Sequence, residues 1–153
     1  MKIDKKADLK PIGIIHTPYN AMEKVPYQGG LAKEISGLEF FKEYEDGLKD
    51  IEQASHLIVL YWLDKADRGI LQEHNPHYAE IHGIFVTRTQ NRPNPIGVTI
   101  AELIERKGNI LRVKGLDALD KTPLLDIKPY FSGIDAVQDA RIEWFEKAHS
   151  IRC

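Results

Sequence analysis

Short apolar runs, separated by turn-forming residues at close intervals, recur along this chain and constrain its fold more than any other feature. The run HLIVLYWL at residues 56–63 is rich in branched and aromatic residues, which is typical of a strand buried on both faces. Further strands are predicted at residues 10–15, 31–35, 38–41, 84–87, 97–106, 110–113 and 124–127. About seven or eight short strands at this spacing predict a mainly β fold, in which a single curved antiparallel sheet forms a barrel.

Turns and a few short helices are predicted between these strands. The dipeptide SG at residues 36–37 is typical of a two-residue hairpin turn, and KGN at residues 107–109 marks a second hairpin. Apolar residues at helical spacing predict a short helix at residues 44–54 and a C-terminal helix at residues 139–149. Residues 64–82 have no clear period, so we expect a loop or an irregular helix there.

Composition places the chain among ordinary globular proteins. It has 153 residues, of which 42% are hydrophobic and 29% charged, so we expect a single domain over residues 1–153 with its motif-bearing core at about 11–130. The only cysteine is Cys153, which excludes an internal disulfide and a multi-cysteine zinc site. The N-terminus lacks the apolar segment of a secretory signal, and no apolar run is long enough to span a bilayer. We therefore expect a cytoplasmic protein with no membrane partner.

Several common catalytic motifs are absent from the sequence. There is no G-x-G-x-x-G after a strand, no Walker A loop, no H-E-x-x-H and no G-x-S-x-G. His74, His77 and His82 lie within nine residues, but Asn75-Pro76 separates the first two. A metal site needs converging ligands with supporting partners, so a polar loop is the favoured interpretation and no bound metal is expected.

The segment GIFVTRTQNRPNPIG at residues 83–97 is too polar to be an ordinary loop. A predicted strand leads to Arg88, and Arg92 and Asn94 follow beside two prolines that stiffen the backbone. Guanidinium groups suit carboxylates and phosphates because their planar fork donates paired hydrogen bonds. The alternative is that Arg92 and Asn94 only brace the loop against neighbouring carbonyl groups.

The segment GLDALDKTPLLDIKPY at residues 115–130 is the second unusual one. Asp117, Asp120 and Asp126 are close together in it, and acidic residues at strand ends can bind an amine, a ribose diol or a metal. The spacing does not fit a calcium loop. The alternative is that these aspartates only form turns.

Both segments, together with IGIIHTPY at residues 12–19, VPYQGGL at 25–31 and ASHLIVLYWL at 54–63, resemble one family. This is the TsaA-like or TrmO family of S-adenosyl-L-methionine-dependent tRNA methyltransferases. Its typical pattern is G-x-F-A-T-R-S-x-x-R-P-N-P-I-G, followed by G-L-D-x-x-D-G-T-P-x-x-D-I-K-P-Y. The similarity extends from about residue 11 to residue 130.

The resemblance implies both a fold and an activity. The fold is a curved antiparallel sheet closed into a barrel, which forms a homodimer and binds the methyl donor near the subunit interface. The activity is methylation of the exocyclic nitrogen of threonylcarbamoyl-adenosine, beside the anticodon of tRNA. The alternative is a protein that binds S-adenosylmethionine but has another acceptor, or a non-enzymatic sensor or interaction role.

The resemblance also implies which residues form the site. Arg92, Asn94 and Asp126 match the most distinctive family positions and are taken as catalytic or architectural. The implied contacts to the methyl donor come from Gln28, Gly29, Gly30, Asp64, Lys65, Arg88, Ile100, Asp117, Ala118, Leu119 and Asp120.

The chain departs from the family pattern in three respects. Lys121 replaces the usual glycine, and this change adds charge near the site and costs nothing if the backbone φ there is negative. Asp64 and Lys65 occupy positions that vary within the family. Some members have a further C-terminal domain, whereas only residues 131–153 follow the matching segment here, so we expect a short form. The net charge is −2, so affinity for tRNA requires a local basic patch rather than bulk charge.

Overall fold

The computed structural model describes residues 5–21, 24–26, 33–74 and 80–149. Contacts divide the chain into two compact units. We call the first, Met1–Asp64 with Ile96–Tyr130, the barrel unit. We call the other, Lys65–Pro95 with Phe131–Cys153, the second unit.

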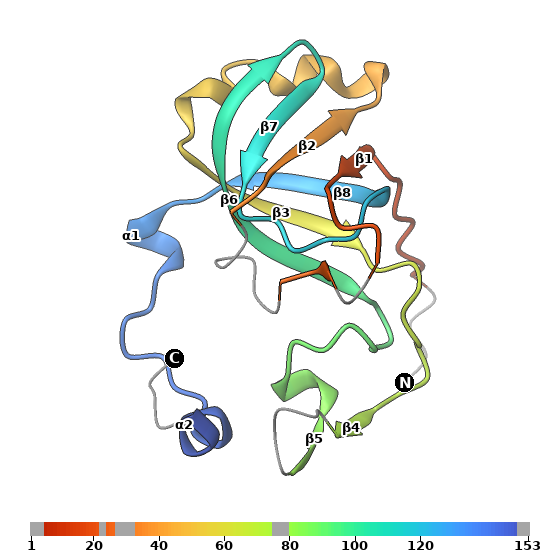
Figure 1. Ribbon diagram of the computed structural model, residues 1–153, viewed down its shortest axis with the longest axis vertical. Coiled ribbons are helices and arrows are strands. Elements are labelled where there is room, and N and C mark those ends of the chain that lie inside the picture. Colours follow the sequence, from red (N-terminus) through yellow and green to blue (C-terminus); the bar gives the residue numbers. More distant parts are fainter. Residues whose placement is uncertain (1–4, 22–23, 27–32, 75–79, 150–153) are drawn as a thin grey trace. The chain divides into compact units, whose positions relative to one another are not determined.

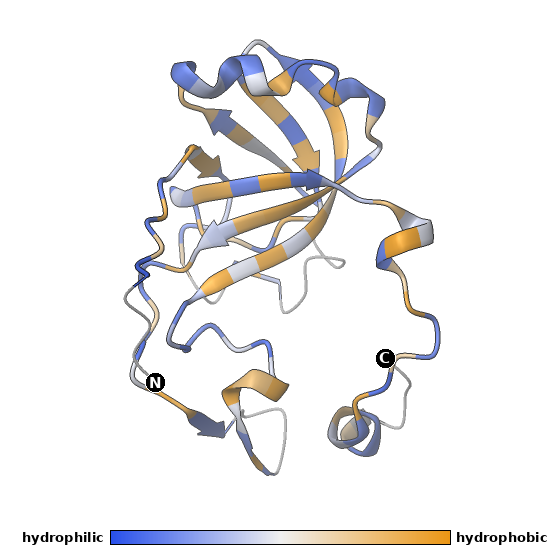
Figure 2. Ribbon diagram, turned by 180° about the vertical axis from the view of Figure 1, so that it is seen from behind, coloured by the Kyte–Doolittle hydropathy of each residue, from blue (hydrophilic) through white to orange (hydrophobic). Residues whose placement is uncertain are grey.

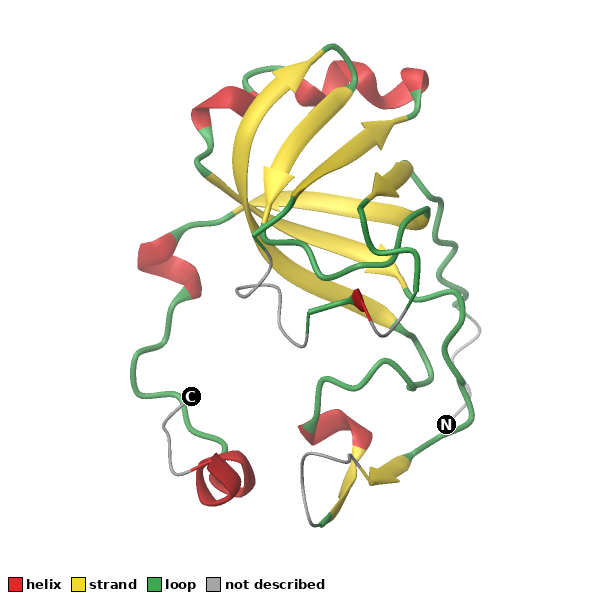
Figure 3. Cartoon of the chain, in the orientation of Figure 1, coloured by secondary structure: helices red, strands yellow, loops and turns green. Residues whose placement is uncertain are grey.

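The barrel unit is a closed antiparallel barrel of six strands, as the sequence predicts (Figures 1 and 3). The strands follow one another around the barrel in the order β1-β2-β7-β6-β3-β8. Their bounds are β1 Gly13–His16, β2 Ile35–Phe40, β3 His56–Trp62, β6 Ile96–Lys107, β7 Ile110–Lys114 and β8 Thr122–Pro129. β3 and the β6–β7 hairpin lie where the apolar run and the KGN turn predict them.

The interior of the barrel is filled by every second residue of the strands. Along β3, Leu57, Val59 and Tyr61 are buried, whereas the residues between them are partly exposed. Hydrophobic and hydrophilic residues alternate along several barrel strands in Figure 2, which is the period that a half-buried strand requires. The core therefore lies inside the barrel, and polar side chains that point inward require partners there.

Short 3-10 helices close one end of the barrel. η3 (Lys42–Leu48) and η4 (Ile51–Gln53) occupy the segment predicted as one helix. Asp50 between them has a φ of 66°, in the left-handed region, and this interrupts a continuous helix. Leu48 is buried in the barrel core, and its carbonyl accepts a hydrogen bond of 2.9 Å from Arg106. The opposite end, where β1, β3 and β7 end, is here called the site end.

The predicted turn at residues 36–37 and the predicted strand at residues 84–87 are wrong. β2 runs straight through Ser36-Gly37, because Gly37 pairs with His16 on one side and with Arg112 on the other. Pairing on both sides outweighs the turn propensity of the dipeptide. Ile84–Val86 forms the 3-10 helix η5 instead of a strand, and both the backbone N–H and the hydroxyl of Thr87 donate to the Ile84 carbonyl.

The second unit contains the remaining elements. β4 (Gln72–His74) and β5 (Ile81–Gly83) form a two-stranded sheet in the segment expected to be irregular, and α1 (Ser132–Asp135) precedes α2 (Glu143–His149). The indole of Trp144 stacks on His82 at 4.5 Å and donates to the Val86 carbonyl at 3.1 Å. Among the residues that the structure describes, no helix combines the length and the apolar character needed to cross a membrane.

Candidate functional site

A largely buried group of polar side chains meets at the site end of the barrel. Asp117 lies in the connection from β7 to β8, and its Oδ1 accepts hydrogen bonds from the Tyr61 hydroxyl at 2.6 Å and from the Thr99 hydroxyl at 2.7 Å. The two hydroxyl oxygens are 2.9 Å apart. Each hydroxyl carries one hydrogen, and the carboxylate is the stronger acceptor, so both hydrogens point to Oδ1. Tyr61, Thr99 and Asp117 are here called the Asp117 network.

The environment of Tyr61 keeps its hydroxyl protonated. Burial raises the pKa of Tyr61 most, and the charge of Asp117 and the hydrogen bond to it raise this pKa further. Tyr61 therefore remains a hydrogen-bond donor throughout the physiological pH range. The phenol stabilises the negative charge of the carboxylate that it contacts.

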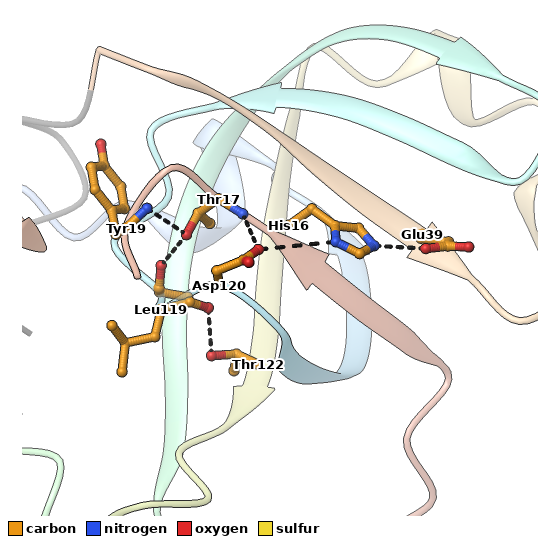
Figure 4. A network of polar contacts seen from close by, with 8 residues as sticks. His16, Thr17, Tyr19, Glu39, Leu119, Asp120 and Thr122 are labelled. Atoms are coloured by element: carbon orange, nitrogen blue, oxygen red, sulfur yellow. Dashed lines mark hydrogen bonds and ion pairs between the residues drawn. The ribbon is translucent and has the colours of Figure 1, made fainter. Parts of the chain in front are cut away.

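The end of β1 is fastened to the loop that carries Asp117 (Figure 4). The Thr17 backbone N–H donates to Asp120 Oδ1 at 3.0 Å, and the Thr17 hydroxyl donates to the Ala118 carbonyl at 2.9 Å. In return, the Asp120 N–H donates to the Tyr19 carbonyl at 2.8 Å. Residues 117–120 are thus held in one conformation, with Leu119 and Asp120 partly exposed and Ala118 buried.

Acidic groups collect around this loop. His16 Nε2 lies 2.6 Å from Glu39 Oε2, and His16 Nδ1 lies 3.9 Å from Asp120 Oδ1 (Figure 4). Burial raises the pKa of the buried Tyr19, and the negative charges of Glu34 and Asp117 raise it further. A surface of carboxylates and backbone carbonyls suits a ligand that carries a positive charge and hydroxyl groups.

Within the second unit, Arg92 and Asn94 brace their loop. Arg92 Nη1 donates to the Thr87 carbonyl at 3.1 Å and to the Thr89 carbonyl at 3.0 Å. Asn94 Oδ1 accepts a hydrogen bond of 3.5 Å from Arg68, which also donates to the Pro93 carbonyl at 2.7 Å. These contacts agree with the alternative interpretation, in which Arg92 and Asn94 brace the loop against neighbouring groups.

The other residues predicted for the site are more exposed. Arg88 and Lys65 of the second unit are exposed, as is Asp64 of the barrel unit. Ile100 is 48% exposed and lies on the outer wall of the barrel. Asp126 pairs with the outward-facing Leu60, so it lies on the outer wall as well.

Asp126 has an ion-pair partner, whereas three of the predicted site residues lie outside the described part of the chain. The Asp126 Oδ2 atom lies 3.0 Å from the Lys128 ammonium. Gln28, Gly29 and Gly30 lie outside the described residues, and so does His77. The structure therefore gathers Asp117, Ala118, Leu119 and Asp120 in one loop and places Asp126 and Ile100 on the outside of the same barrel.

Tyr61 and Thr99 are not among the site residues predicted from the sequence. A signal for both was available, because each is a polar residue at an inward position of a strand that lines a barrel. A buried phenol or hydroxyl requires a hydrogen-bond partner, so an inward-facing Tyr or Thr predicts a polar partner inside the barrel.

Comparison with known proteins places this geometry in a family. Residues 14–136 match the family model of the tRNA-methyltransferase O N-terminal domain. The chain belongs to this family. A "Probable S-adenosyl-L-methionine-binding protein" of Archaeoglobus fulgidus is 55% identical over 141 residues, which are 92% of this chain and 38% of the relative. The chain thus spans well under half the length of that relative.

Two further proteins are similar to this chain at lower identity. The "tRNA (adenine(37)-N6)-methyltransferase" of Escherichia coli is 34% identical over 149 residues, covering 90% of this chain and 63% of the enzyme. The crystal structure of TrmO from Pseudomonas aeruginosa has a TM-score of 0.74 at 33% identity, covering 90% of this chain and 62% of that one. Both likenesses extend over most of this chain but under two thirds of the relative.

The glycine of the family pattern has a physical reason in this structure. Lys121, which stands in its place, has a φ of 65°, in the left-handed region that glycine adopts without strain. The Lys121 N–H donates to the Ile15 carbonyl at 2.7 Å, and this fixes the turn against β1. Because the φ of Lys121 is positive, the lysine strains the backbone at this position.

Replacement of Lys121 with Gly should stabilise the protein. The change removes the left-handed strain of about 1–2 kcal/mol but adds chain entropy to the unfolded state, so we expect a net gain of about 0.5–1 kcal/mol. Urea unfolding at equilibrium measures it. Lys107→Gly is a control at a residue without a positive φ, and it should not stabilise the protein. A destabilised Lys121→Gly variant would contradict the assignment of strain.

Proposed function

We propose that this chain binds S-adenosylmethionine at the site end of the barrel and transfers its methyl group to tRNA. The observation that carries the proposal is the Asp117–Asp120 loop, which hydrogen bonds hold in place while Asp117 and Asp120 remain partly exposed. The names of two relatives, each called a probable S-adenosyl-L-methionine-binding protein, support the same ligand. The proposed acceptor is the exocyclic nitrogen of threonylcarbamoyl-adenosine beside the anticodon.

The donor groups of the loop fit this ligand. S-adenosylmethionine carries an ammonium group and a ribose diol, which carboxylates and backbone carbonyls bind, and a carboxylate, which an arginine binds. Asp117 and Asp120 supply the acidic groups in the barrel unit. The resemblance supports further contacts from Gln28, Gly29, Gly30, Asp64, Lys65, Arg88 and Ile100.

The chain contributes mainly binding and orientation to the reaction. When bound, S-adenosylmethionine supplies an electrophilic methyl group on a sulfonium. Holding that methyl group in line with the acceptor nitrogen removes most of the entropic part of the barrier. The fixed Asp117–Asp120 loop performs this task without reorganising, because its hydrogen bonds already exist in the free protein.

The proposed catalytic residues divide into two kinds. Arg92 and Asn94 act by keeping the loop at residues 87–94 rigid, as their hydrogen bonds to that loop and to Arg68 support. Asp126 is a candidate for removing the proton from the acceptor nitrogen, because its carboxylate is partly exposed on the outer wall. Asp126→Asn should then lower turnover more than donor affinity.

Binding of S-adenosylmethionine should stabilise the folded chain. A ligand at about 100 times its dissociation constant adds about 2.7 kcal/mol to the free energy of unfolding. The measurement is the melting temperature in a titration of the ligand, with adenosine triphosphate as a control nucleotide that lacks the methionyl group. An unchanged melting temperature at millimolar S-adenosylmethionine would exclude donor binding.

The outer wall of β3 and β6 supports a homodimer. Ile96, Val98 and Ile100 are 40%, 44% and 48% exposed, and they stand opposite Trp62, Leu60 and Ile58 on the same wall. A continuous apolar surface on two paired strands is typical of an interface. We propose that two copies of the chain associate through this wall, near the proposed donor contact at Ile100.

A charge in the centre of this wall should dissociate the dimer. Val98→Glu should change the mass measured by light scattering from about 35 kDa to the 17.5 kDa of one chain, because a carboxylate cannot be buried unpaired. Ile110→Glu on β7 is a matched control, since Ile110 is 39% exposed and lies outside the wall. A wild-type mass of one chain at micromolar concentration would refute the dimer.

A second function rests on the names of relatives that are described only as binding S-adenosylmethionine. In that case the chain binds the donor and uses another acceptor or none. Transfer of labelled methyl groups to tRNA, with identification of the modified nucleoside, separates the two functions. A tRNA substrate would also place the protein in the cytoplasm.

A further inference from the structure

We propose that Tyr61 and Thr99 are positioning residues that fix the Asp117 carboxylate for binding the methyl donor, and that Gly97 provides the space this arrangement needs. The inference rests on the proposed function and names the residues on which the affinity of the site depends. Neither hydroxyl has to touch the donor, because each acts through Asp117.

The two hydroxyls reach Asp117 from the inner wall of the barrel. Tyr61 on β3 is 4% exposed and Thr99 on β6 is 7% exposed, whereas Asp117 lies in the loop after β7 and is partly exposed. Two rigid strands therefore hold one end of a carboxylate whose own segment has no regular secondary structure. A side chain held in this way loses little freedom when a ligand binds.

The distribution of hydrogen bonds over the carboxylate is uneven. Both bonds from Tyr61 and Thr99 end on Oδ1. Within the described part of the chain, the other oxygen of Asp117, Oδ2, has no hydrogen-bond partner. Oδ1 thus orients the group, and we assign to Oδ2 the role of accepting a hydrogen bond from the ligand. An ammonium group or a ribose hydroxyl is the ligand chemistry that such an oxygen suits.

Gly97 explains how the tyrosine ring reaches this position. Gly97 stands directly opposite Tyr61 in the pairing of β3 with β6. A Cβ atom on residue 97 would lie 2.6 Å from Cζ of the Tyr61 ring, which is closer than such atoms approach. The ring therefore lies across the bare backbone of Gly97, and its hydroxyl meets Thr99 two residues farther along β6. This accounts for the glycine that ends the NPIG motif at residues 94–97.

The experiment is calorimetric titration of S-adenosylmethionine into the wild type and variants that keep their shape. Tyr61→Phe and Thr99→Val each remove one hydrogen bond to a charged group, so each should weaken donor affinity by about tenfold. Thr99→Ser restores a hydroxyl and should keep most of the affinity. Ser36→Ala is the matched control, because its buried hydroxyl belongs to the same barrel and does not contact Asp117.

A double-mutant cycle separates positioning from a general loss of stability. If Tyr61 acts through Asp117, Tyr61→Phe should weaken binding about tenfold in the wild type and by less than about twofold in the Asp117→Asn background. Gly97→Ala should show the same dependence, because it displaces the same ring. Equal losses in both backgrounds would overturn the positioning role, even where melting temperatures also fall.

The remaining outcomes distinguish this inference from the proposed function. Wild-type affinity in both Tyr61→Phe and Thr99→Val, together with a large loss in Asp117→Asn, would overturn the inference and leave the proposed function standing. Wild-type affinity in Asp117→Asn would overturn the inference and remove Asp117 from the site. Absence of binding to the wild-type chain would overturn the proposed function itself, and the inference with it.

Discussion

Replacement of Asp117 with Asn is expected to weaken the binding of S-adenosylmethionine by roughly thirtyfold to a hundredfold. The change keeps the size of the side chain but removes a charge that accepts hydrogen bonds from Tyr61 and Thr99. A hydrogen bond to a charged group contributes about 1.5–3 kcal/mol, and loss of the charge also weakens the attraction for the donor's ammonium group. Isothermal titration calorimetry measures the change directly.

The matched control for this prediction is Asp46→Asn. Asp46 is an exposed acid in η3, at the end of the barrel opposite the site end, and its replacement makes the same change in net charge. We expect its donor affinity to equal that of the wild type. Equal affinity in both variants would show that the Asp117 carboxylate does not bind the donor.

Binding of tRNA is expected to fall steeply with salt. The chain has a net charge of −2, so its affinity for RNA must come from a few local cations that neutralise phosphates. If about four phosphates are neutralised, the slope of log affinity against log salt should be about −3 to −4. Between 50 and 200 mM salt, this slope corresponds to a loss of roughly a hundredfold in affinity. Filter binding or fluorescence anisotropy over that range measures it.

A charge reversal identifies one of the cations. Lys121 is exposed in the turn that follows Asp120, so Lys121→Glu should reduce the slope by about one if its ammonium contacts a phosphate. Lys107→Glu is the control, because Lys107 lies at the far end of β6. A shallow slope for the wild type would remove tRNA as the partner. An unchanged slope in Lys121→Glu would assign the phosphate contact to another lysine.

The barrel could be predicted from the sequence because its strands carry their signals locally. The apolar run at residues 56–63 gives β3, and the turn at Gly108, with a φ of 60°, gives the β6–β7 hairpin. The continuation of β2 through Ser36-Gly37 could not be predicted in this way. It depends on pairing with β1 and β7, whose residues are far away in the sequence.

The site could be predicted only in part, for a similar reason. Asp117 and Asp120 stand out because acidic residues at a strand end are visible in the sequence. Tyr61 and Thr99 meet Asp117 only after the barrel has closed, at separations of 56 and 18 residues. Arg92 is conspicuous in the sequence, but its residue type fits a substrate contact and a loop brace equally well. Only the structure shows the two carbonyl groups that it contacts.

Transfer of a labelled methyl group tests the central claim most directly. The wild-type chain is incubated with S-adenosylmethionine labelled in the methyl group and with tRNA that carries threonylcarbamoyl-adenosine, and the tRNA is then digested to nucleosides. We expect the label in the exocyclic nitrogen of that one nucleoside, little label with Asp117→Asn, and none with tRNA that lacks the modification. Donor binding without any label in tRNA would contradict the claim and favour a protein that binds S-adenosylmethionine for another purpose.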